Sequence, residues 1–169
     1  MVNKVPEAGE RTSGKITVII PFRDEEVSLE NIIRDLGDQN YPSSFYEVIF
    51  VDDHSSDGSS DRVALKIASL SNFRLIGSPA GNGGKKKGIT LGIEKSNGDI
   101  IVTTDADCRL PMDWLTSIND QFQNNNVIKN LESYYPVVGD WKPRMNIALI
   151  NNPAVKEDFQ EAIQAYNNS

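Results

Sequence analysis

The stretch GDIIVTTDADCRLPMDWL, from Gly98 to Leu115, decides the fold and raises a question of charge. Its first part, DIIVTT at 99–104, is a β-branched apolar run, which is typical of a strand buried on both faces. Asp105 and Asp107 follow this strand with a single residue between them. Two carboxylates so close repel each other unless something positive neutralises them, whereas in a solvated turn an aspartate can cap the next helix. The pair therefore predicts either a divalent cation or a capping turn at the end of this strand.

Buried strands and amphipathic helices alternate along the chain around this stretch. The expected strands are ITVII (16–20), YEVIFV (46–51), FRLIG (73–77) and DIIVTT (99–104). Helices are expected where apolar residues recur at helical spacing, at Leu29, Ile32, Ile33 and Leu36, at Val63, Ile67 and Leu70, at Leu115, Ile118 and Phe122, and also over 85–96. Unbroken apolar strands that alternate with helices predict an α/β fold, an open and mostly parallel sheet with helices on both faces.

The 169 residues are expected to form one domain. Residues 1–14 are polar and lack periodicity, so we expect a flexible N-terminal tail. Residues 15–123 hold the alternating strands and helices, and residues 124–169 are expected to be a short C-terminal extension of the same domain. The candidate elements of this extension are the strands YYPVVG (134–139) and MNIALI (145–150) and a helix over 152–166.

The composition limits the classes of function. The formal net charge is −7, and nonspecific nucleic-acid binding needs a basic surface, so we expect no nucleic-acid partner. No apolar run approaches the roughly 18 residues that span a bilayer, and residues 1–15 lack the apolar region of a signal peptide. Cys108 is the only cysteine, which excludes an internal disulfide and fits a reducing compartment. We therefore expect a cytoplasmic location.

Charged or glycine-rich loops follow the expected parallel strands. They are PFRDEE (21–26), DDHSSDG (52–58), SPAGNGGKKKG (78–88) and DADC (105–108). In an open α/β sheet the ligand lies outside the carboxyl ends of the strands, which is where these loops would meet. Each loop also has a plain structural interpretation, because acids favour the first turn of a helix and lysines often form a solvated surface. Three lysines at a helix start, however, oppose the helix dipole, which suggests that an anion lies there.

Single positions exclude several known ligand loops. An EF-hand that starts at Asp53 would need a glutamate where the chain has Ala64. A Walker A phosphate loop in register with Lys85 would need glycine at Pro79, and a GxGxxG dinucleotide loop would need it at Lys86. The missing dinucleotide fingerprint disfavours a dehydrogenase. A sugar-phosphate nucleotidyltransferase is disfavoured as well, because it needs a glycine-rich loop where PFRDEE stands.

In their order and spacing, four motifs resemble the family 2 inverting glycosyltransferases of GT-A fold. The matching segments are Pro21–Glu25, Val51–Gly58, Gly84–Ile93 and Gly98–Leu115. The resemblance covers residues 15–122 and implies a Rossmann-like portion over 15–123 that binds a nucleotide sugar. Asp24 and Thr90 stand where the family usually has asparagine. Residues 127–169 do not show this resemblance, so we expect the C-terminal part to be short and atypical.

The resemblance implies which residues meet the nucleoside. Pro21, Arg23 and Glu25 would form the edge of the nucleoside pocket. Asp53, the second acid of its pair, would accept hydrogen bonds from the base, usually uracil. Lys85 would face the nucleotide near the base or the diphosphate.

The resemblance also implies a metal site and places the catalytic base late in the chain. Asp105 would approach the ribose and the metal, and Asp107 would ligate Mg²⁺ or Mn²⁺ bound to the diphosphate. Such a cation would relieve the repulsion between the two acids. The family often carries its base as a Glu-Asp pair well after the DxD motif, and here Glu157 and Asp158 are the candidates.

The activity implied is the metal-dependent transfer of a sugar, with inversion, from a nucleotide-diphosphate sugar to an acceptor hydroxyl. The donor is expected to be a UDP-sugar, and the acceptor an unknown glycan, lipid or protein. An alternative is a truncated, non-catalytic fragment that binds UDP or the nucleotide sugar without transferring it. Membrane association is expected only through a longer parent chain, at the cytoplasmic face of the membrane.

Overall fold

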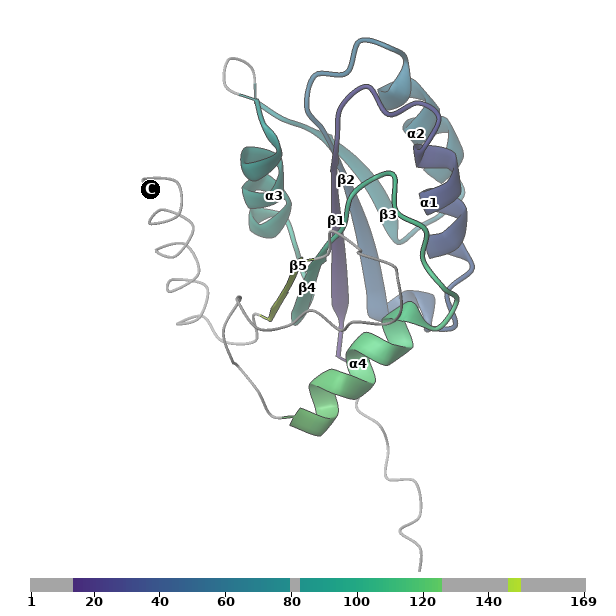
Figure 1. Ribbon diagram of the computed structural model, residues 1–169, viewed down its shortest axis with the longest axis vertical. Helices are drawn as coiled ribbons and strands as arrows, with labels where there is room; N and C mark the ends of the chain where they lie inside the picture. The colour runs from purple at the N-terminus through teal and green to yellow at the C-terminus, as the bar shows by residue number, and fades with distance from the viewer. Residues whose placement is uncertain (1–13, 80–82, 126–145, 150–169) are drawn as a thin grey trace, which may run out of the picture.

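Five strands form one sheet within residues 14–79, 83–125 and 146–149, which are the residues that this computed structural model describes (Figure 1). The strands are β1 (Ile16–Phe22), β2 (Tyr46–Asp52), β3 (Phe73–Gly77), β4 (Ile100–Thr103) and β5 (Asn146–Leu149). Their order across the sheet is β3-β2-β1-β4-β5. β1 pairs in parallel with β2 and β4, β2 pairs in parallel with β3, and β5 runs antiparallel to β4. The predicted open, mostly parallel sheet is therefore confirmed.

Helices cover both faces of the sheet, as predicted. They are α1 (Leu29–Gly37), α2 (Ser59–Ile67), α3 (Lys85–Glu94) and α4 (Trp114–Asn125), with a short 3-10 helix, η1 (Ser43–Phe45), before β2. In Figure 1, α3 lies on one side of the sheet, and α1 and α2 lie on the other. The predicted helix over 85–96 ends slightly early, at Glu94. Because β1, β2 and β3 run parallel, the loops that follow them all emerge at one end of the sheet.

The central position of β1 explains why its residues form a β-branched apolar run. All seven residues of β1 are buried, because neighbouring strands flank it and helices cover it on both faces. Val18 and Ile20 belong to the apolar cluster shared with α1, α2 and α4, whereas Ile19 belongs to the cluster shared with α3. Each isoleucine side chain removed from water stabilises the fold by about 1.5–3 kcal/mol. Alternation along one strand thus anchors both helical layers.

Two glycines bring α3 close to the sheet. A Cβ atom at Gly88 would lie 3.3 Å from Pro21 Cβ, and one at Gly92 would lie 2.5 Å from Ile19 Cγ2. Small residues at these positions let the helix backbone approach β1 more closely than any side chain would permit. This close packing sets where Lys85, the first residue of α3, lies relative to the strand ends.

Replacing Gly92 by alanine is expected to destabilise the fold by about 1–3 kcal/mol, because overpacking outweighs the better helix propensity of alanine. Ile19 is fully buried and β-branched, so it cannot swing away from the added methyl group. Denaturant unfolding measures the effect. Gly37→Ala is the matched control, since a Cβ at that position in α1 meets nothing within 4 Å. Equal stabilities of the two variants would contradict this packing argument.

The C-terminal predictions are tested only in part. β5 confirms the strand expected in MNIALI, over residues 146–149. The candidate strand at 134–139, the helix at 152–166 and most of the predicted tail lie outside the described residues. Gly14, at the tail boundary, is held in place: its N–H donates to Asn119 Oδ1 at 3.0 Å, and its carbonyl accepts a hydrogen bond from Tyr41. No helix in the described part of the chain is long and apolar enough to cross a lipid bilayer.

Candidate functional site

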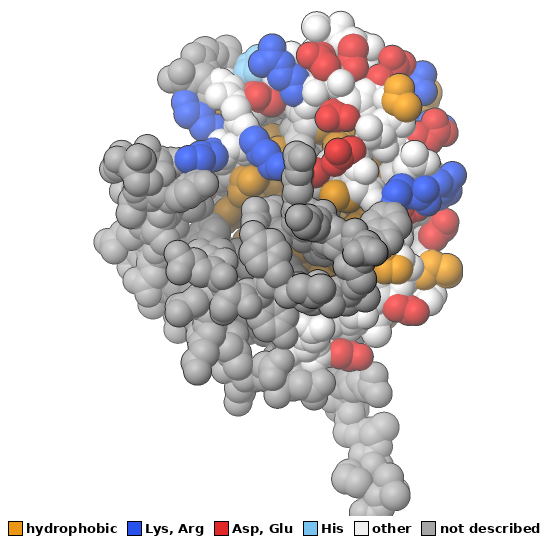
Figure 2. Space-filling model, in the orientation of Figure 1, with side chains coloured by type: hydrophobic (Ala, Val, Ile, Leu, Met, Phe, Trp, Pro, Cys, Tyr) orange, Lys and Arg blue, Asp and Glu red, His pale blue; other side chains and the backbone are white. Residues whose placement is uncertain are grey.

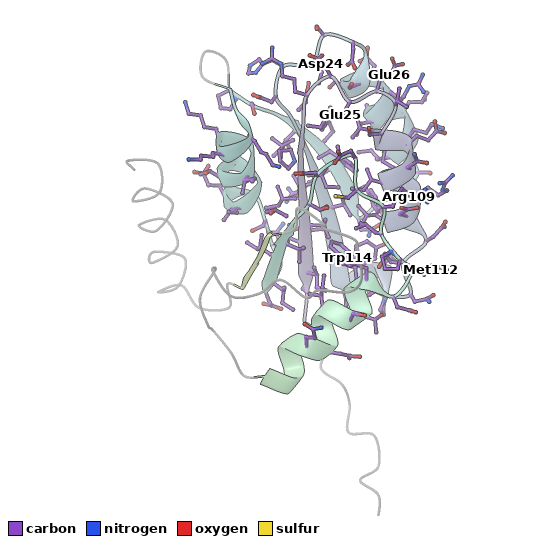
Figure 3. The ribbon with its side chains drawn as sticks, in the orientation of Figure 1. Asp24, Glu25, Glu26, Arg109, Met112 and Trp114 are labelled. Carbon is purple, nitrogen blue, oxygen red and sulfur yellow. The ribbon has the colours of Figure 1, made fainter. Side chains whose placement is uncertain are left out.

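The charged loops of the sequence lie at the end of the sheet where the parallel strands finish. Asp24, Glu25 and Glu26, which follow β1, are labelled there in Figure 3. Figure 2 shows red acidic and blue basic side chains side by side at this end of the molecule. Asp53 follows β2 and Lys85 opens α3, so the strand ends bring opposite charges from distant parts of the chain together.

Asp53 is a buried acid at the start of the loop after β2. Its side chain is 10% exposed, its backbone N–H donates to the carbonyl of Phe22 at 2.9 Å, and its Oδ2 accepts the N–H of Gly84 at 2.8 Å. Oδ1 lies 3.4 Å from Nδ1 of His54. A Cβ atom at Gly83 would collide with this carboxylate, at 2.3 Å from Oδ1. The glycines before α3 therefore pack directly on the acid predicted to bind the base.

Lys85 forms an ion pair with the first acid of the DAD motif. Its Nζ contacts Oδ1 of Asp105, whose side chain is 13% exposed, while the lysine side chain is 54% exposed. The anion predicted near these lysines is thus partly the protein's own carboxylate. Because Gly84 contacts Asp53 and Lys85 contacts Asp105, both acids lie beside the first residues of α3.

Asp107 differs from Asp105 in its surroundings. It is exposed and lies within the turn that is closed by a hydrogen bond from the N–H of Cys108 to the carbonyl of Asp105 at 3.3 Å. Across the described residues, no three His, Cys, Asp or Glu side chains gather in a way that could hold a metal ion. Mg²⁺ is commonly bound by one or two carboxylates together with substrate phosphates. The oxygen donors of Asp105 and Asp107 fit a hard divalent ion that obtains its remaining ligands from a diphosphate and water.

The loop after β1 is tied to the loop after β2 by contacts that the sequence reasoning missed. Asp24 Oδ1 accepts the backbone N–H of Ser56 at 2.7 Å, and the N–H of Asp24 donates to Ser55 Oγ at 3.0 Å. The N–H of Glu25 donates to Ser59 Oγ at 3.0 Å. Asp24 has a φ of 52°, a left-handed conformation that Asp and Asn tolerate better than most residues. An aspartate can therefore replace the usual asparagine at this position.

Asp57 completes this connection at the start of α2. Its Oδ1 accepts hydrogen bonds from the hydroxyl and the backbone N–H of Ser59, and its Oδ2 accepts the N–H of Glu26 at 3.3 Å. The hydrogen bonds from Ser59 hold the pKa of the Asp57 carboxyl below its ordinary value. Ser55 and Ser56 in DDHSSDG, with Ser59 directly after it, are the available signal for this network, because short hydroxyl side chains bond readily to nearby backbone groups.

The remaining candidate residues are less closely associated. Pro21 is buried under α3, close to Gly88. Arg23 is exposed and lies beside its neighbour Asp24, with Nε 3.7 Å from Oδ2. Glu157 and Asp158, the candidate bases, lie outside the described residues.

Comparison with known proteins gives one family. The sequence model described as glycosyl transferase family 2 matches residues 17–168, so the match extends well past the motifs, although residues 127–169 were expected to be atypical. An undecaprenyl-phosphate 4-deoxy-4-formamido-L-arabinose transferase of Photorhabdus laumondii is 30% identical over 143 residues, 84% of this chain and 41% of that protein. A beta-monoglucosyldiacylglycerol synthase of Trichormus variabilis is 26% identical over 113 residues, 66% of this chain and 24% of that protein. The chain thus spans less than half the length of these relatives.

Solved structures give the same fold. A mannosyltransferase from Pyrobaculum calidifontis, in complex with GDP-Man and Mn²⁺, matches with a TM-score of 0.59 and 26% identity, over 64% of this chain and 33% of that chain. S. aureus TarS, in complex with UDP, matches with a TM-score of 0.61 and 21% identity, over 66% of this chain and 33% of that chain. The predicted GT-A type of α/β fold is confirmed by these neighbours.

Proposed function

The chain belongs to glycosyl transferase family 2, and from this premise we propose that it binds a nucleotide-diphosphate sugar, UDP-linked, and transfers the sugar to an acceptor hydroxyl with inversion. The observation that carries the proposal is the meeting of Asp53, Lys85 and Asp105 at the start of α3. These groups come from different loops and supply both acceptors and a cation. A nucleoside diphosphate needs both kinds of group.

The nucleoside is proposed to lie against Asp53. Its buried carboxylate already accepts one N–H, from Gly84, and a carboxylate has room for further donors, such as the N–H of a base. Pro21, Arg23 and Glu25 are proposed to form the edge of this pocket, since they belong to the neighbouring strand end and loop. The guanidinium of Arg23 is exposed and can turn toward an anionic ligand.

The diphosphate is proposed to lie between Lys85 and the DAD motif. Lys85 would donate to a phosphate oxygen, and Asp105 and Asp107 would hold Mg²⁺ or Mn²⁺ against the same group. When bound, the metal ion stabilises the negative charge that develops on the leaving diphosphate. Lys85 stabilises the same charge through a charge-assisted hydrogen bond. Displacement from the far side of the anomeric carbon inverts its configuration.

A positioned base must accept the proton of the attacking hydroxyl. Asp158 and Glu157 are proposed for this role.

The ligands of the similar structures support a metal ion and a nucleotide sugar, because the mannosyltransferase holds GDP-Man and Mn²⁺. TarS holds UDP, so nucleotides of guanine and of uracil are both to be tested. The name of the Photorhabdus relative contains undecaprenyl-phosphate, so a lipid phosphate, which would attack through a phosphate oxygen in place of a hydroxyl, belongs among the acceptors to be tried beside glycans and proteins.

Calorimetric titration with UDP and GDP, each with and without Mn²⁺, tests the proposal. UDP with Mn²⁺ is expected to bind at least about tenfold more tightly than UDP alone, a difference of about 1.4 kcal/mol. Release of UDP from a panel of UDP-sugars, with and without acceptors, then measures turnover. Binding without release under all these conditions would favour the alternative, a chain that only binds the nucleotide sugar. Absence of binding to either nucleotide would reject both.

A further inference from the structure

The segment that follows the DAD motif is fastened to the end of α1 by a buried carboxylate. Arg109 donates from Nε to Asp35 Oδ2 at 2.7 Å and from Nη2 to Asp35 Oδ1 at 3.0 Å, and the N–H of Leu110 donates to Asp35 Oδ2 at 3.0 Å. The Asp35 side chain is only 7% exposed. In Figure 3, Arg109 lies beside α1. This bidentate geometry is the strong and directional form of the Arg–carboxylate pair.

Further contacts continue the attachment toward α4. Gln39 donates from Nε2 to the carbonyl of Pro111 at 2.8 Å, and its Oε1 accepts the N–H of Leu115 at 3.0 Å. The N–H of Asn40 donates to the carbonyl of Met112 at 2.7 Å. Residues 109–115 are thus held along their length, and Asp107 lies just before the first attachment point.

Stability alone does not explain the ion pair between Asp35 and Arg109. Asp35 is buried on α1, but the side chain of Arg109 is 52% exposed, and an ion pair with one partner largely in water contributes little to stability. Burial works against the charged form of Asp35, but hydrogen bonds from Arg109 and Leu110 outweigh it and keep the pKa of this carboxyl below its ordinary value. The pair therefore stays ionised, and its clearest consequence is geometric.

We propose that the Asp35–Arg109 pair positions the turn from Asp105 to Cys108, which is proposed to bind the metal ion. It fixes the backbone after Asp107, so that this exposed carboxylate points where a divalent cation and a diphosphate can use it. The proposal rests on the proposed function, because it assumes that Asp107 binds the cation. Asp35 and Arg109 are positioning residues here and touch neither the cation nor the nucleotide.

The test measures Mn²⁺ affinity at saturating UDP and, separately, UDP affinity without metal. Arg109→Met is expected to weaken Mn²⁺ binding about tenfold or more, as the loss of outer-shell partners of metal ligands generally does. The affinity for UDP without metal is expected to change less than about twofold, because Asp53 and α3 do not depend on this contact. Arg109→Lys, which keeps the charge and loses the fork, is expected to recover part of the Mn²⁺ affinity.

Two further variants separate positioning from folding. The double variant Asp35→Leu with Arg109→Leu avoids a buried, unpaired charge, so it is expected to fold. Its affinity for Mn²⁺ is nevertheless expected to be as low as that of Arg109→Met. Arg34→Met is the control: Arg34 Nε lies 4.0 Å from Asp35 Oδ1, and its side chain bonds to Asn31 on the same helix. Normal Mn²⁺ affinity in a folded double variant, or an equal loss in Arg34→Met, would overturn the proposal. Failure of the unaltered protein to show any Mn²⁺-dependent UDP binding would instead reject the proposed function, and this inference with it.

Discussion

Asp107→Asn is expected to abolish the effect of Mn²⁺ on UDP binding and to slow UDP release from the nucleotide sugar by about 10²–10³-fold. The amide is nearly isosteric but carries no charge, so it cannot balance a divalent cation. Asp107 is exposed, so the substitution leaves the packing around it unchanged and the melting temperature is expected to stay within a few degrees. Calorimetry with UDP and Mn²⁺ measures the first effect, and a coupled assay of UDP release measures the second.

Asp61→Asn is the matched control for this variant, because it removes one exposed carboxylate in the first turn of α2. It is expected to bind UDP and respond to Mn²⁺ as the unaltered protein does. An Asp107→Asn protein that keeps its full response to Mn²⁺ would show that Asp105 alone, or residues outside the described part of the chain, hold the cation. The interpretation of DAD as the metal motif would then be wrong.

The parallel part of the sheet could be predicted because its signals are local. An unbroken run such as ITVII must be covered on both faces, and the parallel strands supply that environment in β1. The loop residues then follow from topology, since the carboxyl ends of parallel strands meet at one edge. The direction of β5 could not be predicted in this way. An isolated run such as NIAL does not say on which side of its partner it enters the sheet or in which sense it runs.

The ion pairs of the site could not be predicted from local pattern. Three successive lysines begin α3, and nothing in KKKG singles out Lys85 as the partner of Asp105. The sequence gives no signal at Asp35, because a charged residue beside Leu36 is ordinary at the edge of an apolar stripe, and its partner Arg109 is 74 positions away. Contacts of this length depend on how α1 and the loop after β4 pack. Sequence periodicity carries no information about that packing.

Lys85→Met is expected to change two affinities in opposite directions. In the unligated protein, Lys85 is the counter-charge of Asp105, so its removal leaves this acid of the DAD motif without its cationic partner. Mn²⁺ alone should then bind more tightly, by up to about fivefold, given that an ion pair near the surface contributes about 0.2–1 kcal/mol. UDP should bind more weakly by about tenfold, because a hydrogen bond to a charged group contributes about 1.5–3 kcal/mol before solvent exposure reduces it.

These opposite signs distinguish an exchange of partners from simple damage to the site. A variant with a distorted site would lose affinity for both ligands. If Lys85 instead moves from Asp105 to the diphosphate when UDP binds, its removal must weaken UDP binding and strengthen Mn²⁺ binding. Lys87→Met, an exposed lysine on the same turn of α3, removes an equal charge and is expected to leave both affinities within about twofold. If Mn²⁺ affinity does not rise in Lys85→Met, then the Lys85–Asp105 pair does not compete with the cation. In that case the two acids are neutralised independently of the lysine.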